Sequence, residues 1–131
     1  MIVWTFLDFT ELNGRNRIRD WLAGLKPVVA KEVAATLRVK LEFARAQPLL
    51  RPPLFEPLTG YPGILEIKFK ARKVQWRPLG FYGPEQLEFT LLVGAKEMNN
   101  RFVPASAPET AKGRRALVLA DRRYVTSQCL L

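Results

Sequence analysis

Residues 64–70 alternate between apolar and polar side chains, and this alternation constrains the fold more than any other stretch of the chain. The apolar set is Leu65, Ile67 and Phe69. The polar set occupies the alternate positions and consists of Glu66, Lys68 and Lys70, with Ile64 at the start of the same row. Because strand side chains alternate with a period of two, the pattern predicts a strand with one apolar face and one basic face. The apolar face would pack against a core and leave the basic row at the surface.

The ten residues from Lys68 to Arg77 hold five cations and no anion. The cations are Lys68, Lys70, Arg72, Lys73 and Arg77. A basic row on a sheet suits a polyanion, and nucleic acid is the common cellular polyanion with regularly spaced charges. The 131-residue chain as a whole has 21 Lys and Arg against 12 Asp and Glu, a net charge of +9. This balance favours nucleic acid as partner, ahead of an acidic protein or an anionic membrane.

The composition bounds the chemistry. A hydrophobic fraction of 48% and a charged fraction of 25% are typical of a globular chain, and we expect residues 1–131 to form one domain. With no histidine and one cysteine, the sequence excludes a structural zinc site and an internal disulfide. We expect no metal or other cofactor, and any catalysis must use Lys, Arg, Tyr or carboxylates. Cys129 is expected to be an incidental thiol in a frayed tail.

The sequence also indicates where the protein resides. No apolar run approaches the roughly 20 residues that span a bilayer. Met1–Phe9 is apolar, but it has no basic leader and no small-residue cleavage site, so it does not resemble a signal peptide. We therefore expect a cytoplasmic protein with no membrane partner.

Periodicity and turn residues predict seven main elements in the order β-α-α-β-β-β-α. They are a strand over Ile2–Phe9, a helix capped by Thr10 or Asn13, a helix from Pro27 to about Gln47, strands over Gly63–Lys70, Val74–Tyr82 and Leu87–Val93, and a helix from Pro108 to about Tyr124. Residues 48–63 and 95–108 are predicted loops, and Pro78 predicts an edge or a bulge. The expected fold is α+β, an antiparallel sheet with a helical hairpin on one face. The other face is expected to stay open and to carry Lys68 and Lys70.

The chain resembles the RelE/HigB superfamily of toxins from type II toxin–antitoxin systems, and most of all the phage-derived, HigB-like branch. RelE-type ribonucleases carry Lys-x-Lys-x-Arg, then three residues, then an aromatic residue and an arginine. The matching residues are Lys68, Lys70, Arg72, Trp76 and Arg77. The family also places a basic residue after a Val-Gly that ends the next strand, where Lys96 stands, and an aromatic residue six positions later, where Phe102 stands.

The resemblance implies a RelE-like fold and a metal-independent, ribosome-dependent mRNA endoribonuclease. In this reaction the ribose 2′-OH attacks the adjacent phosphate, and cations on rigid strands stabilise the charge that develops. Arg77 would clamp the scissile phosphate with its planar fork. Lys70 or Lys68 would act as base, because a lysine among other cations loses its proton more readily. Lys96 or Arg72 would neutralise the leaving side.

The resemblance also implies RNA contacts and partners. Trp76, Phe102, Lys73 and Arg101 would bind RNA. From the residues alone, a packing role is favoured for Trp76, and packing and base stacking are evenly balanced for Phe102. The implied partners are mRNA on the ribosome and a cognate antitoxin, an expected helix-turn-helix protein.

Two other classes of function stay open at this stage. One is a ParE-like inhibitor of DNA gyrase with the same fold, although that branch generally lacks the paired lysines seen at Lys68 and Lys70. The other is a basic phage or host-binding module without catalysis. The basic face could also be a solvated surface whose lysines pair with neighbouring carboxylates.

Overall fold

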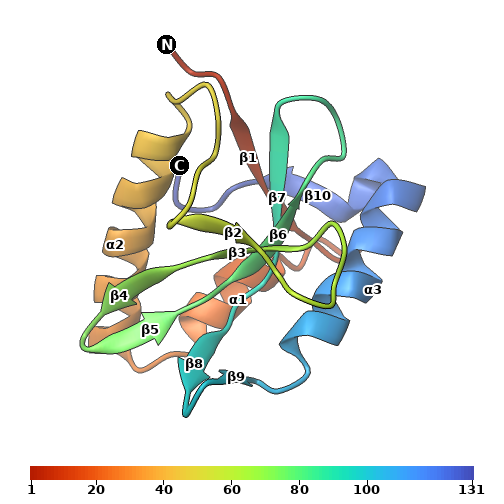
Figure 1. Ribbon diagram of the computed structural model, residues 1–131. Coiled ribbons are helices and arrows are strands. Elements are labelled where there is room, and N and C mark those ends of the chain that lie inside the picture. The colour runs from red at the N-terminus through yellow and green to blue at the C-terminus, as the bar shows by residue number, and fades with distance from the viewer.

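The computed structural model describes residues 1–131 and has an α+β fold with three helices and two β-sheets (Figure 1). The helices are α1 (Arg17–Ala23), α2 (Pro27–Ala44) and α3 (Ala107–Ala120), followed by a short 3-10 helix, η1 (Arg122–Tyr124). The strands are β1 (Thr5–Phe9), β2 (Phe55–Pro57), β3 (Leu65–Ile67), β4 (Phe69–Ala71), β5 (Val74–Trp76), β6 (Leu79–Tyr82), β7 (Glu88–Val93), β8 (Lys96–Met98), β9 (Arg101–Val103) and β10 (Val125–Ser127). The α+β class predicted from the sequence is confirmed.

The strands form a six-stranded sheet in the order β10-β1-β7-β6-β3-β2 and a four-stranded sheet in the order β4-β5-β8-β9. β1 runs parallel to β7, and every other neighbouring pair is antiparallel. Connections as short as those between β3, β6 and β7 do not allow a parallel crossover, so the antiparallel run was predictable and is confirmed.

Two of the predicted strands are each divided between the two sheets. β3 gives way to β4 across Lys68, and β5 gives way to β6 across Arg77 and Pro78. Pro78 cannot donate a backbone hydrogen bond, but its carbonyl accepts the N–H of Ile67 at 2.8 Å. The N–H of Arg77 donates to the carbonyl of Ala95 at 2.9 Å. Lys68 and Arg77 therefore both lie where the first sheet meets the second.

A separate hydrophobic core lies on each face of the main sheet (Figure 1). One core of 17 buried residues packs α1 and α2 against the strands, and the apolar stripe of α2 enters it through Val33, Leu37 and Leu41. The other core, of 10 buried residues, packs α3 over β6 and β7. The expectation that this second face is open is therefore wrong there, because Ala111 and Val118 give α3 an apolar face that the sheet buries.

The helices begin where side chains or proline satisfy their first turn. The Oδ1 of Asn16 accepts hydrogen bonds of 2.9 Å from the N–H groups of Ile18 and Arg19, so Asn16 is the cap of α1 rather than Thr10 or Asn13. Pro27 occupies the first turn of α2, as predicted, because that position needs no N–H donor.

Three short strands lie in segments predicted to be loops, and a fourth lies just beyond the last predicted helix. β2 falls in the proline-rich segment 48–63, and β8 and β9 form a hairpin within 95–108. The last helix ends at Ala120 instead of about Tyr124, and β10 follows it to pair with β1. The predicted boundaries are wrong here because tertiary pairing, not local periodicity, makes these strands.

A buried carboxylate connects β1 to the C-terminal segment. Asp8 is fully buried and accepts hydrogen bonds from Asn16 Nδ2 at 2.9 Å, Gln128 Nε2 at 3.1 Å and the N–H of Cys129 at 2.8 Å. Burial raises the pKa of Asp8 above its ordinary value. Burial, with the Asp8 charge second, also raises the pKa of the Cys129 thiol to about 12. Cys129 is therefore a packed thiol, and the expected frayed tail is wrong.

Acid should weaken the contact between β7 and η1. Glu88 accepts two hydrogen bonds of 2.8 Å from Arg122, and this guanidinium holds the pKa of Glu88 below its ordinary value. A lowered folded-state pKa gives stability that is present above the unfolded pKa and is lost as pH falls through the folded-state pKa. Arg122 is half-exposed, so solvent screens the pair. Glu88→Gln should lower the free energy of unfolding at pH 7 by about 0.5–1 kcal/mol.

Urea unfolding at pH 7 and at pH 3 measures this contribution. At pH 3 the variant and the original chain should differ by less, because the contribution of the Glu88 carboxylate is lost progressively as pH falls below the unfolded-state pKa toward the lower folded-state pKa. Glu85→Gln is the control, since the Glu85 side chain is 71% exposed and 3.9 Å from Arg122. Equal losses for Glu88→Gln at both pH values would contradict the assignment.

Candidate functional site

The predicted basic row forms as the alternation requires. Leu65, Ile67 and Phe69 enter the core beneath α1 and α2. On the other parity, exposure rises along the chain from Ile64 and Glu66, which are buried, through Lys68, which is half-buried, to Lys70, which is exposed. The row thus begins under α3 and ends at the surface.

Arg77 lies at the centre of a group of charged and aromatic side chains at the junction of the two sheets. Its Nη2 contacts Glu66 Oε2, its Nη1 donates to Glu97 Oε1 at 2.9 Å, and its Cζ lies 4.3 Å from the centre of the Phe102 ring. The Arg77 side chain is only 15% exposed, and its Nε has no acceptor. The Arg77 cluster, as used below, comprises Glu66, Lys68, Arg77, Glu97 and Phe102.

Lys68 belongs to this cluster through a shared carboxylate. Its Nζ lies 3.8 Å from Glu66 Oε1 and 3.8 Å from Glu56 Oε2. The two oxygens of Glu66 therefore face Lys68 and Arg77 respectively. The immediate neighbours of Lys68 are carboxylates, in agreement with the alternative that the lysines of this face pair with carboxylates, whereas the catalytic interpretation expected cations around it.

The register of the second sheet decides which side chains share a face. Directly opposed residues on paired strands point to the same side. Lys70 is opposite Gln75, Gln75 is opposite Glu97, and Glu97 is opposite Phe102. Lys70 therefore lies on the face of the Arg77 cluster. No ion pair holds its amine.

Lys96 lies on the opposite face of the same sheet. It is opposite Trp76, which in turn is opposite Phe69, a residue of the core beneath α2. The Lys96 Nζ lies 5.9 Å from the centre of the Trp76 ring, in agreement with this register. The structure does not bring Lys96 together with Lys70.

The remaining candidate cations stand apart from the Arg77 cluster. Arg72 and Lys73 form the turn between β4 and β5 with φ of 53° and 61°, and Arg72 pairs with Glu32 of α2 at 3.9 Å. Arg101 is exposed at the start of β9. These three residues extend the basic surface without contacting Arg77.

Trp76 is a core residue in this structure. It is 2% exposed, its Nε1 donates to the carbonyl of Ala71 at 3.1 Å, and its ring packs edge-on against Trp21 at 6.1 Å. A ring buried to this extent offers no surface to a nucleic-acid base. Phe102 is half-buried, and its ring lies against the guanidinium of Arg77.

Sequence reasoning missed two acidic partners of the site, Glu56 and Glu97. Each contacts a candidate cation only because β2 pairs with β3 and β8 pairs with β5. Both strands lie in segments predicted to be loops, so the sequence held no sign of these contacts. An Asn99-Asn100 turn with φ of 51° and 61° was a missed signal for the β8–β9 hairpin.

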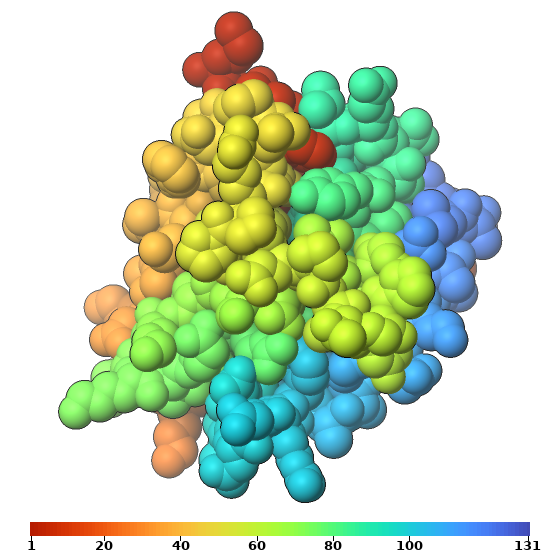
Figure 2. Space-filling model, in the orientation of Figure 1, coloured from red at the N-terminus to blue at the C-terminus, as the bar shows by residue number.

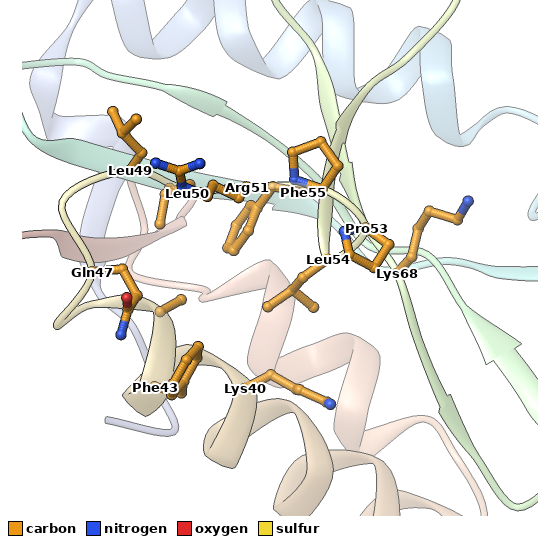
Figure 3. Close-up of a pocket in the computed structure, with 12 residues that line it drawn as sticks. Lys40, Phe43, Gln47, Leu49, Leu50, Arg51, Pro53, Leu54, Phe55 and Lys68 are labelled. Carbon is orange, nitrogen blue, oxygen red and sulfur yellow. The ribbon is translucent and has the colours of Figure 1, made fainter.

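A groove of about 450 Å³ adjoins Lys68 on the side of α2. It runs between the end of α2 and the proline-rich segment that leads to β2. Figure 3 shows Lys40 and Phe43 projecting from α2 toward Leu54 and Phe55. The lining includes three cations and no carboxylate, namely Lys40, Arg51 and Lys68.

Two further observations complete the description of the site. The structure has no group of three or more His, Cys, Asp or Glu side chains that could hold a metal ion. None of its helices has the length and apolar character needed to cross a membrane.

Comparison of the chain with known protein families, with characterised proteins and with solved structures found no match. The functional argument therefore depends on the chain's own residues.

Proposed function

We propose that the protein is a toxin of the RelE/HigB type, with the fold of that superfamily, that cleaves mRNA on the ribosome and is neutralised by a cognate antitoxin in the cytoplasm. The observation that carries the proposal is the gathering of Lys68, Arg77 and Phe102 at the sheet junction, on the face that also carries Lys70. These residues come from separate segments and match the spacing that the family uses. Their convergence supports one RNA-binding surface.

The proposed reaction needs no metal. The ribose 2′-OH gives its proton to a base and O2′ attacks the adjacent phosphorus. The bond from phosphorus to the 5′ oxygen breaks as that oxygen takes a proton from water, which yields a 2′,3′-cyclic phosphate and a 5′-OH end. We assign Lys70 as the base, because its amine is exposed and paired with no carboxylate. Arg77 binds the scissile phosphate, and Lys68 adds positive charge beside it.

Glu66 and Glu97 fix the plane of the Arg77 guanidinium before RNA arrives. A phosphate would bind Arg77 most strongly by replacing one of these carboxylates, most readily Glu97, whose side chain is 29% exposed against 6% for Glu66. Such an exchange is slow for RNA alone, and it is helped when the ribosome presents the phosphate in position. This accounts for an enzyme that requires the ribosome.

The same carboxylates favour a second candidate function, in which the basic surface binds nucleic acid or a partner without cleaving RNA. Arg77 already has two anionic partners, and an arginine so satisfied can serve packing alone. Lys96 and Arg72, which the resemblance to RelE-type ribonucleases would place on the leaving side, lie away from Arg77. Cleavage assays separate the two functions.

Expression of the protein alone in a bacterial host should arrest growth and produce new mRNA 5′ ends inside reading frames. Mapping of RNA ends after induction measures this, and purified protein with ribosomes and a defined mRNA repeats it in vitro. Omission of ribosomes is the control and should abolish cleavage. A DNA gyrase supercoiling assay on the same protein tests the ParE-like alternative.

Growth arrest with intact mRNA and inhibited supercoiling would replace the ribonuclease by a gyrase inhibitor. If the protein binds RNA but produces no new mRNA 5′ ends, with or without ribosomes, the non-catalytic binding function is the one supported.

A further inference from the structure

A second pocket lies at the other end of the basic row, between the 58–64 loop and α3. Its volume is about 280 Å³, and Figure 1 shows the loop that leads into β3 beside α3. Figure 2 shows the same loop against α3 at the surface. Its lining holds two cations and no carboxylate, and consists of Gly60, Tyr61, Pro62, Ile64, Lys112 and Arg115.

Arg115 is held in place but has no anionic partner. Its guanidinium carbon lies 5.5 Å from the centre of the Phe81 ring, and its Nε is buried without an acceptor. The side chain also packs on Gly63, where an added Cβ would come within 3.0 Å of the guanidinium carbon. A planar donor group that is fixed by packing and lacks an acceptor is prepared for an oxyanion.

The other polar groups of the pocket are consistent with an anion. Lys112 is exposed on α3 one turn before Arg115 and pairs with no carboxylate. The one acidic neighbour, Glu109, accepts a hydrogen bond of 3.0 Å from the Tyr61 hydroxyl. This bond raises the pKa of Tyr61, so the hydroxyl stays protonated near neutral pH. The pocket is thus lined by positive charge.

The pocket and the Arg77 cluster lie on one face of the same chain segment. Ile64 lines the pocket, and Glu66, two residues later on the same parity, contacts Arg77. Residues two apart on an extended chain are separated by about 6.6 Å. Both of these side chains are buried, so a strand of nucleic acid that reached both sites would run over the surface above them.

We propose that Lys112 and Arg115 form a phosphate-binding subsite that holds a backbone phosphate of single-stranded RNA, away from the phosphate at Arg77. This inference rests on the proposed function for the identity of the strand. The subsite itself does no chemistry. Arg115 provides the planar donors and Lys112 the second charge.

The test measures binding of a 2′-O-methyl RNA oligonucleotide, which the protein cannot cleave, by fluorescence anisotropy over a range of salt concentrations. Arg115→Gln and Lys112→Gln should each weaken binding about tenfold and reduce the salt slope by about 0.7, the value for one phosphate of a single strand that is no longer neutralised. Lys31→Gln on α2 removes the same charge from the opposite side and should leave affinity within about twofold. Thermal unfolding confirms that each variant folds.

Inorganic phosphate separates the two sources of the anion. Titration into labelled protein should shift the amide resonances of Gly60 and Gly63, and RNA should shift the same resonances. Shifts from phosphate alone, with RNA affinity unchanged in both variants, would overturn the RNA subsite in favour of a free-anion site. No shift and unchanged affinity would overturn it outright. The two proposals can also fail separately. If both variants bind RNA more weakly but the original protein never cleaves mRNA, the subsite is supported and only the proposed ribonuclease is rejected.

Discussion

Replacing Lys70 by alanine should slow ribosome-dependent mRNA cleavage by roughly 10²–10⁴-fold, the usual range for loss of a general base. Lys70 is exposed and has no ion pair, so the substitution should not affect folding. The physical reason for the loss is that no other unpaired amine lies on the face of the Arg77 cluster within the second sheet. Rates with purified ribosomes, together with growth after induction, measure the effect.

Arg77→Lys is the companion variant, because alanine at this position would leave Oε2 of the buried Glu66 without its guanidinium partner. Lysine keeps the charge and loses the planar fork, and it should cost on the order of 10²-fold in cleavage. Lys31→Ala, on the exposed side of α2, is the charge-matched control. Cleavage within tenfold of the original rate in Lys70→Ala would show that Lys70 is not the base.

Gly94→Ala should destabilise the protein by at least about 3 kcal/mol, the upper end of ordinary overpacking. A Cβ at this position would lie 1.8 Å from Cδ2 and 2.1 Å from Cγ of Trp21. The Trp21 ring cannot move aside freely, because it packs against Trp76 beneath the sheet junction. Chemical denaturation followed by tryptophan fluorescence measures both the stability and the displacement of the ring.

Gly113→Ala is the matched control for this prediction. Gly113 lies inside α3, and an added Cβ there would meet nothing within 4 Å. Alanine should stabilise the helix by about 0.5–1 kcal/mol, because it loses less backbone freedom on folding than glycine. A Gly94→Ala protein as stable as the original chain would mean that the packing between Trp21 and the second sheet is looser than described.

Local patterns predicted the parts of the fold that depend on local periodicity. The alternation of Leu65, Ile67 and Phe69 placed these residues in the core, and the spacing of Leu37 and Leu41 placed the buried stripe of α2. The short strands β2 and β10 carry no such pattern. Each forms because another strand supplies its hydrogen bonds, and the sequence of the segment alone does not predict that pairing.

The candidate site was predictable to the same extent. Parity alone placed Lys68 and Lys70 on one face, but the side on which Lys96 lies depends on the pairing of β5 with β8. A shift of that register by one residue would place Lys96, instead of Glu97, on the face of Arg77. Sequence spacing could not decide between these two arrangements, and they differ in the sign of the charge next to the candidate phosphate site.

The position of β1 also has a consequence for the order in which the chain can fold during synthesis. This strand lies between β7 and β10, so it can pair only after Glu88–Val93 and Val125–Ser127 have been made. The buried carboxylate of Asp8 likewise obtains two of its three donors from Gln128 and Cys129. A nascent chain therefore holds its first strand unpaired while α1 and α2 emerge, because contacts between distant segments form late. The complete six-stranded sheet therefore forms only after β10 has been made, whereas every member of the Arg77 cluster is present once β9 has been made.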